Sequence, residues 1–460
     1  MGCCRKRPDF YRFFEPVEQV SNWSVLRTFP WQVWVCFVLH FLDGFAYFSL
    51  STNLTIYLTT EHQISDIDAG LYYSVWGALL VILGLPSGAI IDKLGIKWSL
   101  IVGAGFNTMG RIVFAMSATL WVQLAALFIG TTVGAGFFIS TLHIAVKRYT
   151  KGVAARSVAF SFLYWAMNIG AIAAMLSTDL ALDSEVIWQG YQLLFVVAAV
   201  VSLVTLVISI NFHELPTRVE SPTVKECLGV FREKPFYKLL GFNVSLIPVR
   251  AIFRYGEALL PIYLVRVYPG ISYGAVLAIN PLCIIVLTPI VGLLSKRISF
   301  VYGFVVLGTL VSALAFLTAI SWHELSAVVV ALAIFTLGEA IYSPKSGQYT
   351  LEHSPRGKEG LYSGLISIPY FAGNAVAGEF SGWLLDTYCP ARSDSMETTE
   401  FDLAYAQECS NVWAWIVGSA LLTPLLLILL YRLLRFRKTE LQRQLEMDRP
   451  LNESSSESQS

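Results

Sequence analysis

The chain has 460 residues, of which 55% are hydrophobic and 14% are charged, and its 32 basic residues are balanced by 32 acidic ones. Soluble globular proteins carry about 25% charged residues, so this composition argues against a soluble enzyme. A zero net charge lacks the basic excess of a nucleic-acid-binding protein, and an aromatic content of 13% argues against a disordered chain. The seven cysteines show no metal-ligand spacing. The composition therefore predicts an all-α, polytopic membrane protein with no metal site.

Apolar stretches long enough to cross about 30 Å of hydrocarbon, which takes roughly 20 residues, recur twelve times along the chain. The first 30 residues lack the apolar core of a cleavable signal peptide. We predict twelve transmembrane helices near residues 31–58, 69–91, 98–117, 121–146, 157–179, 188–212, 242–266, 272–295, 299–320, 325–347, 359–386 and 411–433.

Lys and Arg residues are concentrated in alternate loops. If the N-terminus is cytosolic, the great majority of the 32 Lys and Arg residues fall on the cytosolic side, and the outer segments hold Arg266 and Arg392. Cytosolic loops of membrane proteins carry such an excess of basic residues. We therefore predict an integral membrane protein with both termini in the cytosol, in the plasma membrane or an internal organelle membrane.

A polar loop with three prolines divides the chain into two six-helix halves. Leu54–Leu58 (LTIYL) and Leu260–Leu264 (LPIYL) end the first span of each half with similar sequences. This organisation resembles that of the major facilitator superfamily, whose substrate site lies between the halves near mid-membrane. We expect a cytosolic N-terminal segment at 1–30, an N-terminal half at 31–212, a cytosolic loop at 213–241, a C-terminal half at 242–433 and a disordered cytosolic tail at 434–460.

The predicted loop after the second span carries a short motif, GAIIDKLGIK, at residues 88–97. It resembles the superfamily signature G-x-x-x-D-x-x-G-x-[KR]. Glycine permits a tight turn between helices, and the acid can cap the N-terminus of the neighbouring helix. The resemblance implies a role in conformational gating for Gly88, Asp92, Gly95 and Lys97, and an ordinary hairpin loop is the alternative.

Three further segments resemble the proton-dependent oligopeptide transporter (POT) family. Tyr164–Gly170 (YWAMNIG) is similar to that family's F-Y-x-x-I-N-x-G-S segment, and Gly338–Pro344 (GEAIYSP) is similar to its G-E-x-x-x-S-P segment. Asp43–Phe48 (DGFAYF) lies where the family carries E-R-F-x-Y-Y. The resemblance implies a transporter of peptides or similar small solutes that uses protons as the coupling ion.

The chain departs from that family at the positions of its cations. His40, Asp43 and Gly44 occupy the positions of the span-one motif E-x-x-E-R, so its arginine is absent. Residues 131–141 contain no counterpart of the span-four lysine, and His143 is the nearest basic side chain. In the family those cations hold the peptide carboxylate and couple to the proton. The departures predict a divergent relative with its own cargo.

Charged residues inside the predicted spans are candidate functional residues, because each costs roughly 2.5–3.5 kcal/mol on insertion scales. Arg250, Arg254 and Glu257 are spaced i, i+4 and i+7 and share one face of span seven. Glu339 lies near the middle of span ten, where it would receive an amino group of the cargo, while Arg250 or Arg254 would receive an anionic group. The alternative is a set of buried ion pairs that fix helix packing, with Arg254 and Glu257 neutralising each other.

Span one contributes Asp43 near its middle and Tyr47 one turn later, on the same face. Competition between a proton and an arginine for Asp43 or Glu257 would break an ion pair and free a gate, and a packing ion pair is again the alternative. We interpret His40 as a packed histidine, and a proton relay is the alternative. The predicted substrate-binding or proton-coupling residues are Asp43, Tyr47, Tyr164, Trp165, Asn168, Arg250, Arg254, Glu257 and Glu339.

Two groups of residues are candidates for covalent modification. Gly2, Cys3 and Cys4 are candidate acylation sites, and an unmodified basic tail that contacts anionic lipid is the alternative. Cys389 and Cys409 lie in one predicted outer loop, where an oxidising exterior would allow a disulfide.

These observations predict a secondary active transporter, not an enzyme, that moves a small polar solute such as an amino acid or short peptide by alternating access. The chain has no G-x-x-x-x-G-K-[ST] motif of an ATP-driven pump. We expect protons as the coupling ion, no cofactor, no nucleic-acid partner, contact with the lipid bilayer, and a monomer by default. The alternatives are an organic-anion, nitrate or sugar carrier that uses Arg250 and Arg254, or a non-transporting membrane sensor.

Overall fold

The structure is a computed structural model that describes residues 26–150, 153–184, 190–215, 229–294, 301–353, 359–391 and 402–434. Nearly all of these residues are helical, and none of them lies in a strand. The predicted all-α class is confirmed. The candidate acylation sites Gly2, Cys3 and Cys4 and the predicted disordered tail from residue 435 onward lie outside the described residues.

The N-terminal half contains six spans, four of which are single α-helices of 21 to 30 residues. The first span is divided between two helices, and the fourth contains a short π-helical turn. The elements are α2 (Trp31–Ser51), α3 (Leu54–Glu61), α4 (Asp66–Leu94), α5 (Ile96–Met116), α6 (Leu120–Ala125), η1 (Ala126–Thr131), α7 (Thr132–Tyr149), α8 (Val153–Leu182) and α9 (Gly190–Ile210).

The C-terminal half is more broken, and several of its helices have a proline in the first turn, where the missing N–H of proline is no cost. Pro248 and Pro261 stand in the first turns of two of the three helices that build span seven. The elements are η2 (Val230–Arg232), α11 (Lys234–Val244), α12 (Ile247–Ala258), α13 (Leu260–Val267), α14 (Tyr273–Leu277), α15 (Ile279–Leu294), α16 (Val301–Leu314), α17 (Leu317–Ser321), α18 (Leu325–Glu352), α19 (Glu359–Tyr388), α20 (Leu403–Cys409), α21 (Asn411–Leu429) and α22 (Tyr431–Leu434).

One predicted boundary is wrong. The cytosolic loop was expected to run to residue 241, but α11 begins at Lys234. Pro235 stands in the first turn of α11, where proline is favoured, and the helix buries Phe236 and Leu239. The start of this helix was missed because the spans were predicted from uninterrupted runs of apolar residues, and the lysines of α11 interrupt such a run.

Ten helices of the described chain are long and apolar enough to cross a membrane, and the bent pair α11 and α12 raises the number to eleven. The remaining predicted span corresponds to α19, whose 30 residues reach about 45 Å at 1.5 Å per residue. Each predicted span thus has a helix or a stack of helices at its position, and the arrangement is the predicted twelve-helix one.

The side chains of α9 are distributed as in a helix that faces lipid. Its buried residues include Ser202, Thr205 and Ser209, whereas Val200 is 54% and Leu203 is 47% exposed. A surface helix in water would bury its large apolar residues. From Ala198 to Ser209 the buried residues are small or polar while large apolar residues lie outside, a pattern typical of helices packed in a bilayer.

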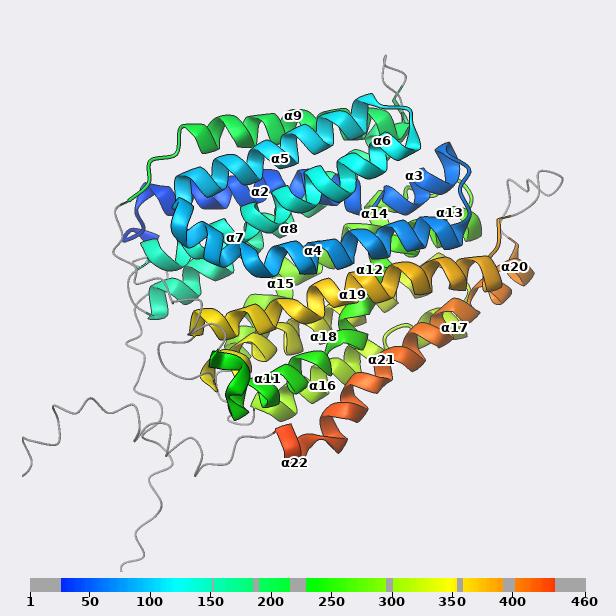
Figure 1. Cartoon of the computed structure of the whole chain (residues 1–460). Helices are drawn as coiled ribbons and strands as arrows, with labels where there is room; N and C mark the ends of the chain where they lie inside the picture. The colour runs from blue at the N-terminus through cyan, green and yellow to red at the C-terminus, as the bar shows by residue number, and fades with distance from the viewer. Residues whose placement is uncertain are drawn as a thin grey trace, which may run out of the picture.

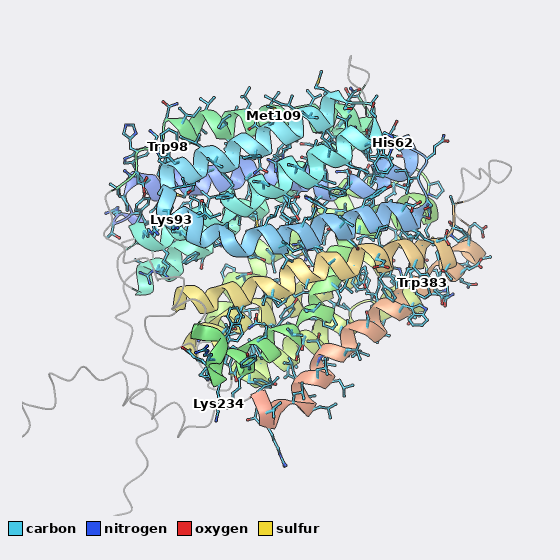
Figure 2. All side chains as sticks on the ribbon, viewed as in Figure 1. His62, Lys93, Trp98, Met109, Lys234 and Trp383 are labelled. Atoms are coloured by element: carbon cyan, nitrogen blue, oxygen red, sulfur yellow. A yellow bond between two sulfur atoms is a disulfide. The ribbon has the colours of Figure 1, made fainter. Side chains whose placement is uncertain are left out.

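The long helices run along one axis, so the bundle has two ends (Figure 1). Figure 2 places Lys93 and Lys234 toward one end and His62 toward the other. Cys389 and Cys409 form the predicted disulfide, and α20, which ends at Cys409, lies at the same end as His62 (Figures 1 and 2). We call the first the lysine end (Lys93 and Lys234) and the second the disulfide end (Cys389 and Cys409).

The two halves meet along α4 and α19, which lie side by side in the middle of the bundle (Figure 1). A Cβ atom added at Gly378 would lie 2.6 Å from the carbonyl oxygen of Gly70, closer than real Cβ contacts. Both glycines lie in the disulfide-end portions of their helices, because α4 begins there and α19 ends there. The halves are therefore closed against each other toward the disulfide end.

Candidate functional site

The charged residues of α12 lie at the contact between the two halves. The spacing of Arg250, Arg254 and Glu257 predicted a common face, and all three side chains are buried. Their contacts differ, however. Arg254 and Glu257 reach helices of the N-terminal half, whereas Arg250 reaches α18 of its own half.

Arg254 and Glu257 form a short ion pair within α12. The guanidinium Nη1 lies 2.7 Å from Glu257 Oε1, and the same nitrogen donates to the hydroxyl of Tyr47 on α2 at 3.2 Å. The ring of Tyr47 lies 5.6 Å from that of Trp76 on α4. The mutual neutralisation that the i, i+3 spacing predicted is present, and it is extended to the N-terminal half by Tyr47.

The second oxygen of Glu257 binds donors from two helices of the N-terminal half. Glu257 Oε2 accepts a hydrogen bond from the Tyr73 hydroxyl on α4 at 2.7 Å and another from the Ser51 hydroxyl on α2. Beside Glu257, the carbonyl of Ala258 accepts a hydrogen bond from the Thr55 hydroxyl on α3 at 2.8 Å. Glu257 thus joins α2, α4 and α12 and holds the halves together. We call Tyr47, Ser51, Tyr73, Arg254 and Glu257 the interface cluster.

Arg250 and Glu339 form a second buried pair within the C-terminal half. Arg250 Nη1 lies 3.6 Å from Glu339 Oε1, and its Nη2 donates to the Ser343 hydroxyl at 2.9 Å. The guanidinium carbon stands 4.7 Å from the centre of the Tyr342 ring, a cation–π distance. Asn280 on α15 donates to Glu339 Oε2 at 3.2 Å. We call Arg250, Asn280, Glu339, Tyr342 and Ser343 the α18 cluster.

These two clusters contain two guanidiniums and two carboxylates, so their charges balance. The side chains of Arg250, Glu339, Arg254 and Glu257 are between 2% and 10% exposed. Removing one partner of such a pair leaves an uncompensated buried charge. An incoming group can therefore replace a partner only if it carries the same charge, which makes the α18 cluster suited to a ligand that carries both an amino and a carboxylate group.

Asp43 lies elsewhere, between α2, α5 and α9. Its carboxylate is 3.5 Å from Arg111 Nη2, and Asn107 donates to it at 3.4 Å. Arg111 Nη1 also donates to the Ser202 hydroxyl at 2.8 Å. The side chains of Asp43 and Tyr47 were expected on one face, but they contact different helices. The position of Asp43 fits the packing alternative, an ion pair inside the N-terminal half.

The close packing of α2 on α8 leaves no room for a side chain at position 44, where the family that this chain resembles carries an arginine. A Cβ atom at Gly44 would lie 2.9 Å from the Met167 carbonyl oxygen, and one at Gly170 would lie 2.8 Å from the Phe45 nitrogen. Helices α2 and α8 therefore cross with their backbones in contact. An arginine at position 44 would require these helices to separate.

The predicted residues of α8 lie beside this crossing. Tyr164 packs against the apolar cluster of Ile284 and Ala340 from the C-terminal half. The Asn168 amide donates to the Tyr164 carbonyl at 2.8 Å, a bond within the helix, and Trp165 lies 5.6 Å from Phe162. Tyr164 therefore belongs to the contact between the halves, while the polar group of Asn168 is used locally.

The predicted gating motif forms the turn between α4 and α5. Gly95 has φ +82°, a conformation that favours glycine, and Lys97 lies in the first turn of α5. The side chain of Asp92 and the surroundings of Gly88 lie outside what the structure describes. The helix cap expected from an acid comes from Glu214, whose carboxylate accepts from the Ile96 and Lys97 nitrogens at 2.8 and 3.1 Å. Glu214 was not predicted, although the uncapped start of α5 after Gly95 was a signal for a distant acid.

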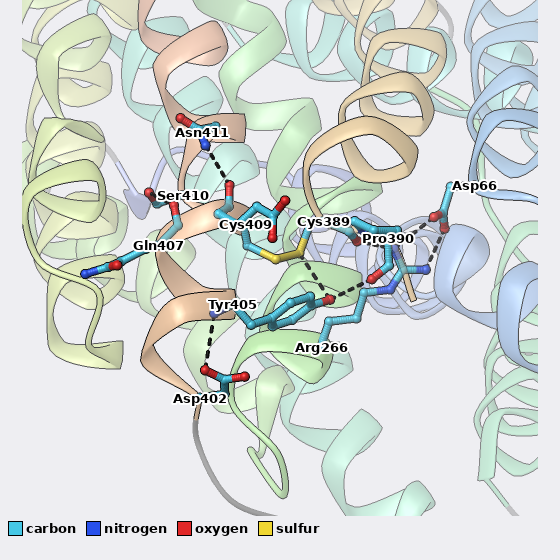
Figure 3. Close-up of a disulfide and its surroundings, with 11 residues drawn as sticks. Asp66, Arg266, Cys389, Pro390, Asp402, Tyr405, Gln407, Cys409, Ser410 and Asn411 are labelled. Carbon is cyan, nitrogen blue, oxygen red and sulfur yellow. Dashed lines mark hydrogen bonds and ion pairs between the residues drawn. A yellow bond between two sulfur atoms is a disulfide. The ribbon is translucent and has the colours of Figure 1, made fainter. Parts of the chain in front are cut away.

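An ion pair at the disulfide end was also missed. Arg266 on α13 donates through both terminal nitrogens to the Asp66 carboxylate on α4, each at 2.8 Å, and to the Cys389 carbonyl at 2.7 Å. Figure 3 shows this fork beside the Cys389–Cys409 disulfide. Both charges were visible in the sequence, but they come from different halves and are 200 positions apart.

A carboxylate of the N-terminal half caps a helix of the C-terminal half at the same end. Asp179, near the end of α8, accepts from the Gly274 and Ala275 nitrogens at the start of α14, at 2.9 and 2.8 Å. With the Asp66–Arg266 pair, it gives the disulfide end two polar contacts between the halves. Among the described residues, no group of three or more His, Cys, Asp or Glu side chains is placed to hold a metal ion.

Comparison with known proteins identifies relatives of this arrangement. The family model of the Major Facilitator Superfamily matches residues 36–378 and 258–455. The uncharacterized MFS-type transporter YttB of Bacillus subtilis is 22% identical over 341 residues, which cover 73% of this chain and 83% of that protein. Dipeptide and tripeptide permease A of Chromobacterium violaceum is 28% identical over 179 residues, which cover 38% of this chain but only 35% of the permease.

Solved structures share the fold. A POT family transporter in complex with 5-aminolevulinic acid aligns with a TM-score of 0.72 at 16% identity, covering 88% of this chain and 97% of that one. A POT family transporter in complex with a thioalcohol-conjugated peptide aligns with a TM-score of 0.73 at 15% identity, covering 90% of this chain and 100% of that one. At these identities the likeness shows the fold.

Proposed function

Because the chain belongs to the major facilitator superfamily, we propose that it is a proton-coupled secondary transporter that moves a small zwitterionic solute by alternating access. The observation that carries this proposal is the interface cluster, in which a buried carboxylate of one half, Glu257, is bound by donors of the other half. Such a carboxylate can link protonation to the contact between the halves. This activity needs no cofactor and no chemical reaction.

The α18 cluster is the proposed solute site. Arg250 and Glu339 lie 3.6 Å apart, longer than the 2.7 Å of the Arg254–Glu257 pair, so their pairing is the looser of the two. A solute carboxylate would bind Arg250 and a solute amino group would bind Glu339. Each buried charge would then keep a partner of opposite sign, and the exchange would avoid an uncompensated charge.

The balance of charges favours a zwitterion over the anion of the alternative hypothesis. Arg250 and Arg254 were the candidate anion site, but each already has a carboxylate partner, Glu339 or Glu257. A simple anion would have to displace a carboxylate and leave it unpaired. The relatives agree with this preference, because they include dipeptide and tripeptide permeases and a transporter bound to 5-aminolevulinic acid, which carries an amino and a carboxyl group.

Protonation of Glu257 is the proposed coupling step. The ionised carboxylate accepts from both Ser51 and Tyr73. A protonated carboxyl group has a donor of its own and accepts more weakly, so it would weaken the contacts with α2 and α4. Proton binding would therefore loosen the closed contact between the halves and favour opening at the disulfide end.

We place the lysine end, with both termini, in the cytosol. The excess of Lys and Arg on that side supports this orientation. The Cys389–Cys409 disulfide at the opposite end supports it independently, because disulfides persist outside the reducing cytosol. In this orientation the described conformation is closed toward the exterior or lumen.

The test is competition for uptake by purified protein in proteoliposomes. Labelled dipeptide is the transported probe, and the competitors are the same dipeptide, its N-acetylated form and its C-terminal amide. We expect the free dipeptide to compete best. Glu339→Gln should remove the advantage of the free amino group, and Arg250→Gln that of the free carboxylate.

Glu324→Gln is the matched control, because Glu324 is exposed, lies outside both clusters and accepts a hydrogen bond from the neighbouring Ser326. It should keep the wild-type order of competitors. Equal competition by all three dipeptides in the wild type would contradict a zwitterion site. An N-acetylated dipeptide that competes best would support the anion carrier.

A further inference from the structure

Two histidines of the N-terminal half meet inside the bundle, apart from both charged clusters. The rings of His40 on α2 and His143 on α7 lie 5.8 Å apart between centroids, with their planes at 82°. His143 also stacks on Phe160 of α8 at 5.8 Å. The pair therefore stands where α2, α7 and α8 meet.

His40 is enclosed, and one of its ring nitrogens is unused. The residue is 4% exposed, and its Nδ1 has no hydrogen-bond partner among the described residues. Buried polar groups in proteins are nearly always hydrogen-bonded, and an unsatisfied one is destabilising. Packing alone does not account for an imidazole at this place, since leucine would fill it without leaving a polar atom unbonded.

His143 has an acceptor nitrogen available. Its Nδ1 lies 2.9 Å from the Ile139 carbonyl oxygen. A carbonyl oxygen only accepts, so Nδ1 carries the hydrogen and Nε2 is the acceptor of the neutral ring. The His143 side chain is exposed, and α7 continues from it to its end at Tyr149 on the lysine-end side. His143 is therefore the member of the pair from which a proton would pass to the enclosed His40.

We propose that His40 and His143 form a proton-binding pair of the N-terminal half that takes up one proton from the lysine-end side. The proton binds at Nε2 of His143 or at Nδ1 of His40. A second proton is disfavoured because two imidazolium rings at this distance repel each other, so the pair titrates as one unit. The role of the pair in coupling rests on the proposed transport function, but the binding of the proton does not.

Other charged groups surround the pair on each of the three helices. Lys147 stands one turn from it on α7, toward the lysine end, and Arg156 stands one turn from the stacked ring on α8. Both oppose a second positive charge. Asp43 is one turn away on α2, but its carboxylate is held by Arg111 of α5. The charges of Lys147 and Arg156 therefore add to the repulsion that disfavours a second proton on the pair.

The proton-binding claim is tested by NMR on the full-length protein in lipid nanodiscs, with 15N-labelled histidine. His40→Gln and His143→Gln assign the two imidazole signals, which are followed between about pH 4 and pH 8, where histidines titrate. We expect the pair to take up one proton in this range, and each single substitution to shift the midpoint of the remaining ring. Independent titration, or no protonation of either ring, would overturn the proposal.

The coupling role is tested with proteoliposomes and labelled dipeptide. His143→Gln should keep counterflow exchange at a fixed pH and lose accumulation driven by a pH gradient. His213→Gln is the matched control, because His213 is an exposed histidine at the same end, close to Asn211, and it should behave as the wild type. Unchanged gradient-driven accumulation in His143→Gln would contradict the role in coupling. Absence of counterflow in the wild type would count against the proposed function, while the NMR titration would still decide on the pair.

Discussion

Neutralising Glu257 should shift the protein toward a state that is open at the disulfide end. The Arg254–Glu257 pair lies within one helix, so it persists when the halves separate. Among the contacts that opening breaks are the hydrogen bonds from Ser51 and Tyr73 to the carboxylate. Hydrogen bonds to charged groups contribute about 1.5–3 kcal/mol each. Tyr73→Phe removes one of them and should shift the equilibrium about tenfold or more. Glu257→Gln weakens both and also leaves the buried charge of Arg254 without its partner, so it should shift the equilibrium about a hundredfold.

The shift can be measured as a distance between spin labels at the disulfide end. Trp121 and Trp322 are 69% and 60% exposed, one in each half, and each follows a span that runs toward that end. Labels at Trp121→Cys and Trp322→Cys, in a background that keeps only Cys389 and Cys409 of the native cysteines, would report a longer distance when the halves part. Glu324→Gln serves as the control and should leave the distance distribution unchanged.

The double variant decides whether the two residues act through one bond. Because Tyr73 acts through its bond to Glu257, Tyr73→Phe should add little to Glu257→Gln. Fully additive shifts would refute the shared contact. An unchanged distance in both single variants would refute the claim that the interface cluster holds the halves together.

Two further predictions concern the contacts at the disulfide end. Gly378→Leu should prevent closure of α4 on α19, because even a Cβ atom at Gly378 would lie 2.6 Å from the Gly70 carbonyl; the spin-label distance should be long, and a wild-type distance would contradict the close contact. Cys409→Ser removes a disulfide with a sequence separation of 20 residues, which should cost about 3 kcal/mol of stability. Cys409→Ser should therefore have a lower Tm than the wild type in the absence of a reducing agent, and equal Tm values would contradict a stabilising bond.

The spans and the local ion pair were predictable because each depends on neighbouring residues. A run of about 20 apolar residues identifies a transmembrane helix wherever it packs. The i, i+3 spacing of Arg254 and Glu257 brings their side chains together on any helix, and the structure has them 2.7 Å apart. The start of α11 was missed for the same reason, because its lysines interrupt the apolar run.

The contacts between distant helices were not predictable from spacing. Asp43 was recognised as a buried charge, yet nothing in the sequence paired it with Arg111. The same holds for Asp66 with Arg266, which lie in different halves. Gly44 carried a usable signal, because a glycine in the middle of a span often marks a close helix crossing. Its partner, Met167, became known only from the packing of α2 on α8.

The most direct test of the transporter assignment is accumulation of labelled dipeptide in proteoliposomes under an inward proton gradient. The account predicts that the wild type raises the internal dipeptide above the external concentration and that a protonophore abolishes the accumulation. It also predicts that Glu339→Gln fails to accumulate dipeptide while Glu324→Gln does. Dipeptide that enters only to equilibrium, whatever the proton gradient, would contradict proton-coupled transport by this protein.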